Sequence, residues 1–369
     1  MKINLIGQRN HLGFGTHYSG FVDSFKKLSL LKGIAQEYDA FSQEGLSSLS
    51  RLSHPSDINV WFSGFMSPQS HQARGRNIVW AIFEHTSLSR AYISMLERAD
   101  LVWVPSEWGK TILINCGLQE AKVNVVPEGV DPQAFHPFCR NRQDPKREKF
   151  RFLMFGKYEE RKGYNQLLNA FKEAFENNPN VELWIKGDYF IDHQRKHELL
   201  DSKIQSMKCS NIKLVPGLAS RDEIFTLLNL VDAFVFPSRA EGWGLPLIEA
   251  LATGLPTLAV YYSGQTEYLK HLEGKFLPIK FDLVPISDPE FKQFQTSDGG
   301  DFGVWAEASV SDLAENMYHF YDHQIMWREK ALKASAVVRE KFSWDRSVDI
   351  ALESMITSNL LPAPKFIPQ

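Results

Sequence analysis

The sequence alternates short apolar runs with stretches of helical periodicity over most of its length, and many of the runs stop at a glycine or a proline. The runs fall into two blocks, one at 2–6, 58–62, 78–83, 101–104 and 122–126 and the other at 152–155, 181–185, 212–215, 233–236, 257–260 and 276–279. Strands that are apolar on both faces and separated by helices indicate parallel sheets covered on both sides. The pattern therefore predicts an α/β protein with two doubly wound, Rossmann-like domains.

A polar and basic segment at 138–150, FCRNRQDPKREKF, separates the two blocks and has the composition of a linker. We therefore expect a first domain at 1–137 and a second domain at 151–342. The remaining residues, 343–369, are predicted to form a helix and a loose tail. With 369 residues the chain is long enough for two domains of ordinary size.

The last quarter of the chain has two different patterns. Residues 281–302 are rich in Pro, Asp and Gly, and we predict a long loop that is either functional or mobile. From residue 310 to about residue 358 the apolar periodicity predicts two or three helices, of which the last begins near Ser343 or Asp345.

Residues 233–260 contain a predicted strand, a glycine-rich loop and a buried helix in succession. The loop carries Glu241, Gly242 and Gly244, and the helix after it is apolar nearly all round except for Glu249. A buried carboxylate needs hydrogen-bond donors, which a ligand would supply, and N–H groups at a helix start behind glycines attract anions such as phosphate. A structural helix with one capped carboxylate would show the same pattern.

A second charged stretch follows the first strand of the second block. Gly156 ends this strand, and Arg161, Lys162 and Gly163 then precede an apolar helix. Two cations between a parallel strand and a helix lie at the carboxyl edge of the sheet, where open α/β sheets bind ligands. A solvated charge pair at a helix start is the alternative interpretation.

Taken together, these two stretches resemble motifs of the retaining glycosyltransferases of the GT4 type (glycosyl transferases group 1), which have the GT-B fold. The run from Glu241 to Glu249 is similar to their Glu-x7-Glu motif, and the run from Gly156 to Gly163 is similar to their Gly-x4-Arg-Lys-Gly stretch. The resemblance covers most of the chain, is closest from about 100 to 270, and is supported by flanking segments at 104–108, 126–131, 184–188 and 215–217.

The resemblance implies a role for each charged position of the two motifs. Arg161 and Lys162 would neutralise the diphosphate of a nucleotide sugar. Glu241 would hold hydroxyl groups of the donor sugar, and Glu249 would accept hydrogen bonds from the ribose.

Glycines and backbone groups complete the implied donor site. The remaining donor-binding positions are Gly15, Gly156, Gly187, Pro216, Gly242, Gly244 and Leu245. Of these, the loop around Gly244 and Leu245 would contact phosphate, Gly15 would let an opposing loop approach the diphosphate, and the base would lie near Gly187 and Pro216. In relatives a histidine of the first domain touches the donor sugar, and His85 is the candidate here, with His17 as a second one.

The activity implied by the resemblance is the retaining transfer of a hexose from a UDP- or GDP-linked donor to a glycan or lipid-linked acceptor. Charge grows on the leaving phosphate as the glycosidic bond breaks, and fixed cations aimed there stabilise the transition state without a metal. No cofactor is expected. The acceptor would bind mainly on the first domain, and the C-terminal helix would cross back to that domain.

Two alternatives change the class of protein. A catalytically inactive partner or chaperone of another glycosyltransferase would keep the GT-B fold, although the expected donor-site residue types are all present. A dehydrogenase that uses the first glycine loop is disfavoured, because Gly13 and Gly15 lack a third glycine at the dinucleotide-binding offset.

Charge and apolar content limit the partners and the location. The formal net charge is −3, so no basic field favours nucleic acid. The N-terminal apolar run is too short for a signal peptide, and no run approaches the roughly 18 residues of a membrane span. The three cysteines have no metal-ligand spacing and indicate free thiols. We expect a cytoplasmic protein, with room for peripheral contact at the inner face of a membrane.

Overall fold

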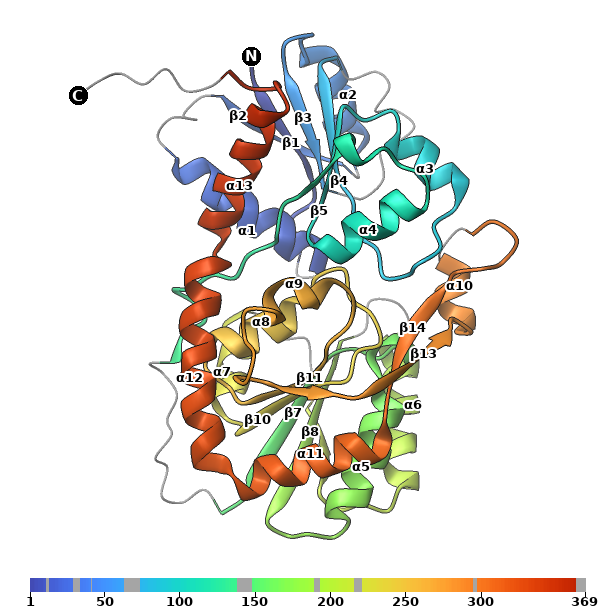
Figure 1. Cartoon of the computed structure of the whole chain (residues 1–369), viewed down its shortest axis with the longest axis vertical. Coiled ribbons are helices and arrows are strands. Elements are labelled where there is room, and N and C mark those ends of the chain that lie inside the picture. Colours follow the sequence, from blue (N-terminus) through green and yellow to red (C-terminus); the bar gives the residue numbers. More distant parts are fainter. Residues whose placement is uncertain are drawn as a thin grey trace, which may run out of the picture. The chain divides into compact units, whose positions relative to one another are not determined.

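The computed structural model describes residues 1–10, 13–28, 34–40, 42–62, 74–137, 148–188, 193–215, 221–294 and 297–362. The chain divides into two compact units (Figure 1). The first unit consists of Met1–Gly129, Thr296–Asp301 and Phe342–Gln369, and the second consists of Val130–Gln295 and Phe302–Lys341. Most of the predicted linker, from 138 to 147, lies outside the described residues.

The first unit is built on a parallel sheet with the strand order β2-β1-β3-β4-β5-β6. Its strands are β1 (Ile3–Gly7), β2 (Ala35–Asp39), β3 (Ile58–Trp61), β4 (Arg76–Trp80), β5 (Leu101–Val104) and β6 (Val123–Val125). Its helices are α1 (Gly13–Lys27), α2 (Gln43–Leu52), α3 (Arg90–Leu96), α4 (Glu107–Asn115) and α13 (Trp344–Thr357), with a 3-10 turn at Glu120–Lys122. The predicted doubly wound α/β unit is confirmed.

The second unit repeats this architecture with the strand order β12-β11-β10-β7-β8-β9, again parallel throughout. Its strands are β7 (Phe150–Lys157), β8 (Val181–Asp188), β9 (Ile212–Leu214), β10 (Ala233–Phe236), β11 (Thr257–Val260) and β12 (Leu277–Ile279). Its helices are α5 (Tyr164–Phe175), α6 (His193–Ser206), α7 (Arg221–Asn229), α8 (Leu245–Ala252), α9 (Thr266–Leu269), α10 (Pro289–Phe294), α11 (Val310–Asp322) and α12 (Gln324–Lys341), with 3-10 turns at Glu160–Lys162 and Ser263–Gln265.

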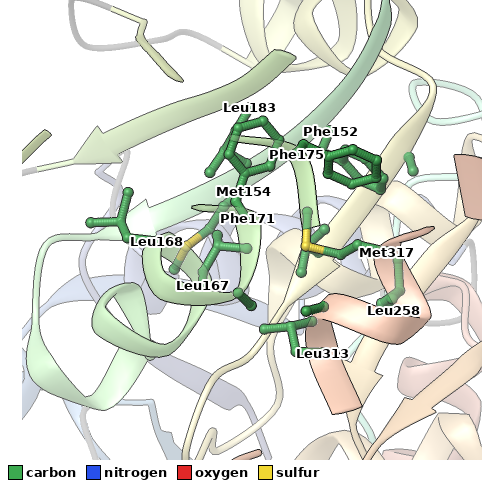
Figure 2. Packing of buried hydrophobic residues seen from close by; sticks show 14 of the residues in the cluster. Phe152, Met154, Leu167, Leu168, Phe171, Phe175, Leu183, Leu258, Leu313 and Met317 are labelled. Carbon is green, nitrogen blue, oxygen red and sulfur yellow. The ribbon is translucent and has the colours of Figure 1, made fainter. Parts of the chain in front are cut away.

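Burial of apolar side chains explains why these segments form a sheet with helices packed on it. Figure 2 shows Phe152 and Met154 of β7 in one cluster with Phe171 and Phe175 of α5 and with Met317 of α11. Each of these side chains is fully or almost fully buried. The apolar stripe of α5 is therefore held against the middle strand of the sheet, which fixes the turn that precedes this helix.

The prediction of a long loop at 281–302 was wrong. The segment begins with strand β13 (Phe281–Pro285), which pairs antiparallel with β14 (Val304–Ala308), and helix α10 lies between them. Asp282 and Pro285 belong to β13 and Pro289 begins α10, so the composition conceals the regular elements, and the alternation of Phe281 and Leu283 with other residues is too short to stand out from it.

Two or three helices were predicted near the C-terminus, and the structure has three, α11, α12 and α13. Ser343 is the N-cap of α13, since its side chain accepts a hydrogen bond from Arg346 N. Helix α13 lies beside α1 in the first unit (Figure 1), where Trp103 Nε1 donates to Ser354 Oγ over 2.8 Å and Ser347 Oγ donates to the carbonyl of Pro127 over 2.6 Å. The terminal helix thus returns to the first unit, as the family resemblance implies.

Candidate active site

The two charged motifs of the second unit meet at one edge of its sheet. Arg161 and Lys162 lie on the 3-10 turn that follows β7, and Glu241 lies on the loop that follows β10. Strands β7 and β10 are parallel neighbours in the sheet, so their carboxyl ends meet at the same edge. This is the edge at which open α/β sheets bind ligands.

Glu241 is the centre of the cluster. Its Oε1 accepts hydrogen bonds from Lys162 Nζ and from Ser238 Oγ, each over 2.5 Å, and its Oε2 accepts one from Arg161 Nη1 over 3.0 Å. The three charged side chains are each less than a tenth exposed. Charge-assisted hydrogen bonds of this kind are the strong ones, so the two motifs are tied together through one carboxylate.

Arg161 is held in place from three sides. Its Nη1 also donates to the carbonyl of Ala240 over 2.7 Å, and its Nη2 donates to Glu159 over 3.2 Å. The backbones of the turn and the loop are also joined, because Arg239 N donates to the carbonyl of Arg161 over 2.7 Å. The turn that carries the two cations and the loop that carries Glu241 therefore form one hydrogen-bonded structure.

The charges of the cluster shift one another's pKa values. Burial raises the pKa of Glu241, but the charges of Lys162 and Arg161 and the hydrogen bonds from Lys162 and Ser238 outweigh burial and lower it to about 2. Burial lowers the pKa of Lys162 against the opposing effect of Glu241. Burial raises the pKa of Glu159, but the charges of Arg161, Lys157 and Lys162 together outweigh burial and leave it below its ordinary value. Glu241 is thus ionised at neutral pH.

The 3-10 turn at Ser263–Gln265 binds the backbone of Glu241. Ser263 Oγ accepts from Glu241 N over 2.8 Å, and Gly264 N donates to the carbonyl of Glu241 over 2.9 Å. Ser263 has a left-handed backbone with φ 62° although it is not a glycine, a conformation that persists only where the surroundings enforce it. A Cβ on Gly264 would lie 1.9 Å from the carbonyl oxygen of Gly242.

The glycine loop and the helix after it have the predicted form. Gly244 has φ +90° and is the N-cap of α8, which begins at Leu245, and Tyr268 Oη donates to the carbonyl of Gly244 over 3.3 Å. Glu249 lies within α8 and is 4% exposed. The sequence prediction of a buried carboxylate in a buried helix is confirmed, and the role of Glu249 toward a ribose stays a prediction.

The two glycines expected near the donor lie side by side on adjacent strands. Gly156 of β7 pairs with Gly187 of β8 in the parallel register, and Tyr164 Oη donates to the carbonyl of Gly156 over 2.7 Å. The aliphatic stem of Lys162 runs past Gly156, with its Cδ 3.5 Å from the position of a Cβ there. Pro216, the other residue expected near the base, lies outside the described residues.

The remaining candidates, Gly15, His85 and His17, belong to the first unit. A Cβ on Gly15 would lie 2.5 Å from the backbone nitrogen of Asn10, so only glycine fits. His85 is 4% exposed, and burial lowers its pKa to about 4. His17 is fully buried, and burial lowers its pKa to about 3; its Nδ1 lies 4.0 Å from Glu128 Oε2.

Sequence reasoning missed four residues that shape the cluster. Ser238 and Ser263 bind Glu241, Glu159 binds Arg161, and Arg239 connects the cluster to the β13–β14 ribbon, as described below. A signal was present for Ser238, because it follows a proline at the carboxyl end of a buried strand. Ser263 and Arg239 have partners far away in the sequence, and Glu159 is one of several charged residues in its own turn, so periodicity gives no sign of them.

The two doubly wound parallel units have the GT-B fold. HepE of Anabaena, solved in complex with UDP and glucose, shares this fold over 97% of this chain and all of that chain, with a TM-score of 0.69 and 16% identity. Residues 137–280 match the family described as glycosyl transferases group 1. This match identifies residues 137–280 as a domain of the glycosyl transferases group 1 family.

Curated relatives agree with this assignment. Mannosylfructose-phosphate synthase of Agrobacterium fabrum is 27% identical over 187 residues, which cover 48% of this chain and 41% of that protein. Glycogen synthase of Mycobacterium tuberculosis is 29% identical over 212 residues, which cover 56% of this chain and 44% of that protein. The matched part of the chain thus spans less than half the length of either relative.

The described residues contain neither a metal-binding cluster nor a membrane-spanning helix. In that part of the chain, no three His, Cys, Asp or Glu side chains gather where they could hold a metal ion. Among the helices described there, none combines the length and the hydropathy that a bilayer span needs.

Proposed function

We propose that the chain is a retaining glycosyltransferase that moves a hexose from a nucleoside-diphosphate sugar to a glycan or lipid-linked acceptor, without a metal. The observation that carries the proposal is the placement of Arg161 and Lys162 against Glu241 at the carboxyl edge of the second sheet. This edge combines two fixed cations with a carboxylate that hydroxyl groups can bind.

The chemistry needs an anchor for the charge that develops on the diphosphate. As the bond from the anomeric carbon to the phosphate oxygen breaks, negative charge accumulates on the leaving group. Arg161 and Lys162 are buried and already oriented, so little reorganisation is needed when this charge appears. Glu241 is ionised and accepts hydrogen bonds only, which suits sugar hydroxyl groups as donors. In the retaining mechanism that we propose, the leaving phosphate takes the proton of the acceptor hydroxyl.

The donor is proposed to carry uridine or guanosine diphosphate. HepE, whose fold is shared, has been solved with UDP and glucose, which puts UDP-sugars first in the order of testing. Glu249 would receive the ribose hydroxyl groups, and the backbone near Gly244 and Leu245 would receive phosphate oxygens, because N–H groups at a helix start attract anions.

Thermal unfolding with a panel of UDP-, GDP- and ADP-sugars tests the donor site. A ligand at 100 times its dissociation constant adds about 2.7 kcal/mol of stability, so one nucleotide should raise the melting temperature of the wild type. Lys162→Ala should abolish this rise. Lys172→Ala is the matched control, since Lys172 pairs with Glu176 on the exposed face of α5 in the same unit, and it should respond as the wild type does.

Transfer itself is tested with the nucleotide that binds. The proposal expects sugar transfer to a glycan or lipid-linked acceptor that is insensitive to chelators and retains the anomeric configuration, as read by NMR. Donor binding without turnover on any acceptor would favour the inactive GT-B partner. Full transfer by folded Lys162→Ala, or inversion of the anomeric centre, would refute the mechanism.

A further inference from the structure

Arg239 lies on the same loop as Glu241, between β10 and α8, but its side chain binds partners outside the Glu241 cluster. Its Nη1 donates to Glu160 Oε1 over 2.6 Å, and its Nη2 donates to Glu307 on β14. The Arg239 side chain is 7% exposed, whereas the two carboxylates are 40% and 41% exposed. A buried guanidinium therefore joins two carboxylates that come from different parts of the unit.

The two partners of Arg239 have different neighbours. Glu160 directly precedes Arg161 and Lys162 and forms the 3-10 turn with them. Glu307 also accepts a hydrogen bond from Gln166 Nε2 of α5 over 3.0 Å. The planar fork of arginine can hold both carboxylates at once, and lysine cannot reproduce this geometry.

The β13–β14 ribbon also contacts the loop through its backbone and its small core. Ala306 N donates to the carbonyl of Arg239 over 3.0 Å. Ala240, the residue before Glu241, is packed in an apolar cluster with Ile286, Phe302 and Trp305 of the ribbon segment. The loop is thus bounded by the cation-bearing turn on one side and by the ribbon on the other.

We propose that Arg239 is a positioning residue and that, through Glu307, the β13–β14 ribbon sets the geometry of the turn that holds Arg161 and Lys162. The role assumed for these two cations rests on the proposed function. Arg239 and Glu241 lie two residues apart on the same loop. Arg239 binds the turn at Glu160, and Glu241 binds it at Arg161 and Lys162. Loss of the ribbon contact frees the Glu160 side of this double attachment.

Hydrogen exchange tests the attachment without any substrate. In Glu307→Gln, which keeps the shape of the side chain, and in Arg239→Lys, amides of 159–163 and 238–241 should exchange several-fold faster than in the wild type, while the strands stay protected. Glu290→Gln is the matched control, because Glu290 lies on α10 of the same ribbon segment and pairs with Lys196. Unchanged exchange in both variants would overturn the inference.

Steady-state kinetics test the consequence for transfer. Because the cations act on charge that grows in the transition state, kcat should fall about tenfold in Glu307→Gln with little change in the donor KM. The double variant Arg239→Lys/Glu307→Gln should be no worse than the worse single variant, since both remove the same link. Unchanged kcat, or additive losses, would refute the positioning role.

The two proposals fail in different ways. A wild-type chain that binds and transfers no nucleotide sugar would refute the proposed function, and the exchange experiment would still decide whether the ribbon holds the turn. A wild-type chain that transfers sugar, with exchange and kcat unaffected in the Glu307 and Arg239 variants, would refute the positioning role alone.

Discussion

Replacement of Glu241 by Gln should destabilise the second unit although it removes only a charge. Glu241 lies between Arg161 and Lys162, and the variant would leave two buried cations next to each other without the carboxylate between them. Removing one partner of a buried ion pair is costly, because the remaining charge has lost its solvent and its counter-charge.

The size of the effect follows from the pKa of Glu241. The folded protein lowers this pKa from 4.5 to about 2, and each unit corresponds to 1.36 kcal/mol, so the ionised form is favoured by about 3 kcal/mol. The contribution is present above pH 4.5 and is lost as the pH falls toward 2, because the group protonates in the unfolded chain first. The neutral amide of Glu241→Gln should lack it at every pH.

Thermal and urea unfolding of the wild type and Glu241→Gln measure this difference. A loss of about 3 kcal/mol in a unit of roughly 200 residues lowers the melting temperature by about 6–12 °C. Glu176→Gln is the control, since Glu176 forms an exposed pair with Lys172 and should cost about 0.5 kcal/mol or less. The reasoning fails if Glu241→Gln unfolds like the control, or if its deficit does not shrink between pH 4.5 and 2.

Three further changes test other contacts. Gly264→Ala should weaken donor binding by more than about tenfold in the thermal-shift assay, because its Cβ would lie 1.9 Å from the carbonyl of Gly242 and displace the Glu-bearing loop. His17 should cost the wild type about 2 kcal/mol at pH 5, because the unfolded chain takes up a proton below pH 6.5 and the folded chain, with a pKa of about 3, does not; His17→Leu should remove this slope from urea unfolding. Gly20→Ala should destabilise the first unit by about 1–3 kcal/mol, because its Cβ would lie 2.3 Å from Trp344 Cε2.

Each of these tests has an outcome that contradicts it. Undiminished donor binding by Gly264→Ala would mean that the loop adapts. An acid slope that persists in His17→Leu would assign the slope to other groups. For Gly20→Ala, Gly13→Ala on the same helix is the control, because a Cβ there meets nothing within 4 Å, and equal stability of the two variants would refute the close packing against Trp344.

The sheet cores and the paired motifs were predictable from the sequence because both leave local signals. Strands β10 and β11 match their predicted bounds residue for residue, since each is a short, mostly apolar run with a proline at one end, Pro237 after β10 and Pro256 before β11. The turn with Arg161 and Lys162 and the loop with Glu241 were placed at the correct sheet edge. Their direct contact follows from the adjacency of β7 and β10, which the order of strands along the chain does not specify.

What escaped prediction depends on contacts between distant residues or on partial burial. Strand β2, AQEYD, is a half-buried edge strand without an apolar run, so its sequence resembles a loop. The ribbon of β13 and β14 pairs residues separated by a helix and several turn-forming residues. The sequence gives Arg239 the pattern of a solvated loop residue, because only the fold brings its partners Glu160 and Glu307 to it.

The return of α13 to the first unit changes the order in which the protein is completed during synthesis. Residues 130–341 contain the whole of the second unit, whereas the first unit lacks α13 until residues 344–357 have left the ribosome. Domains usually fold in the order in which they are made. Here the unit that is started first is finished last, so a truncation after residue 341 should damage the N-terminal half of the protein.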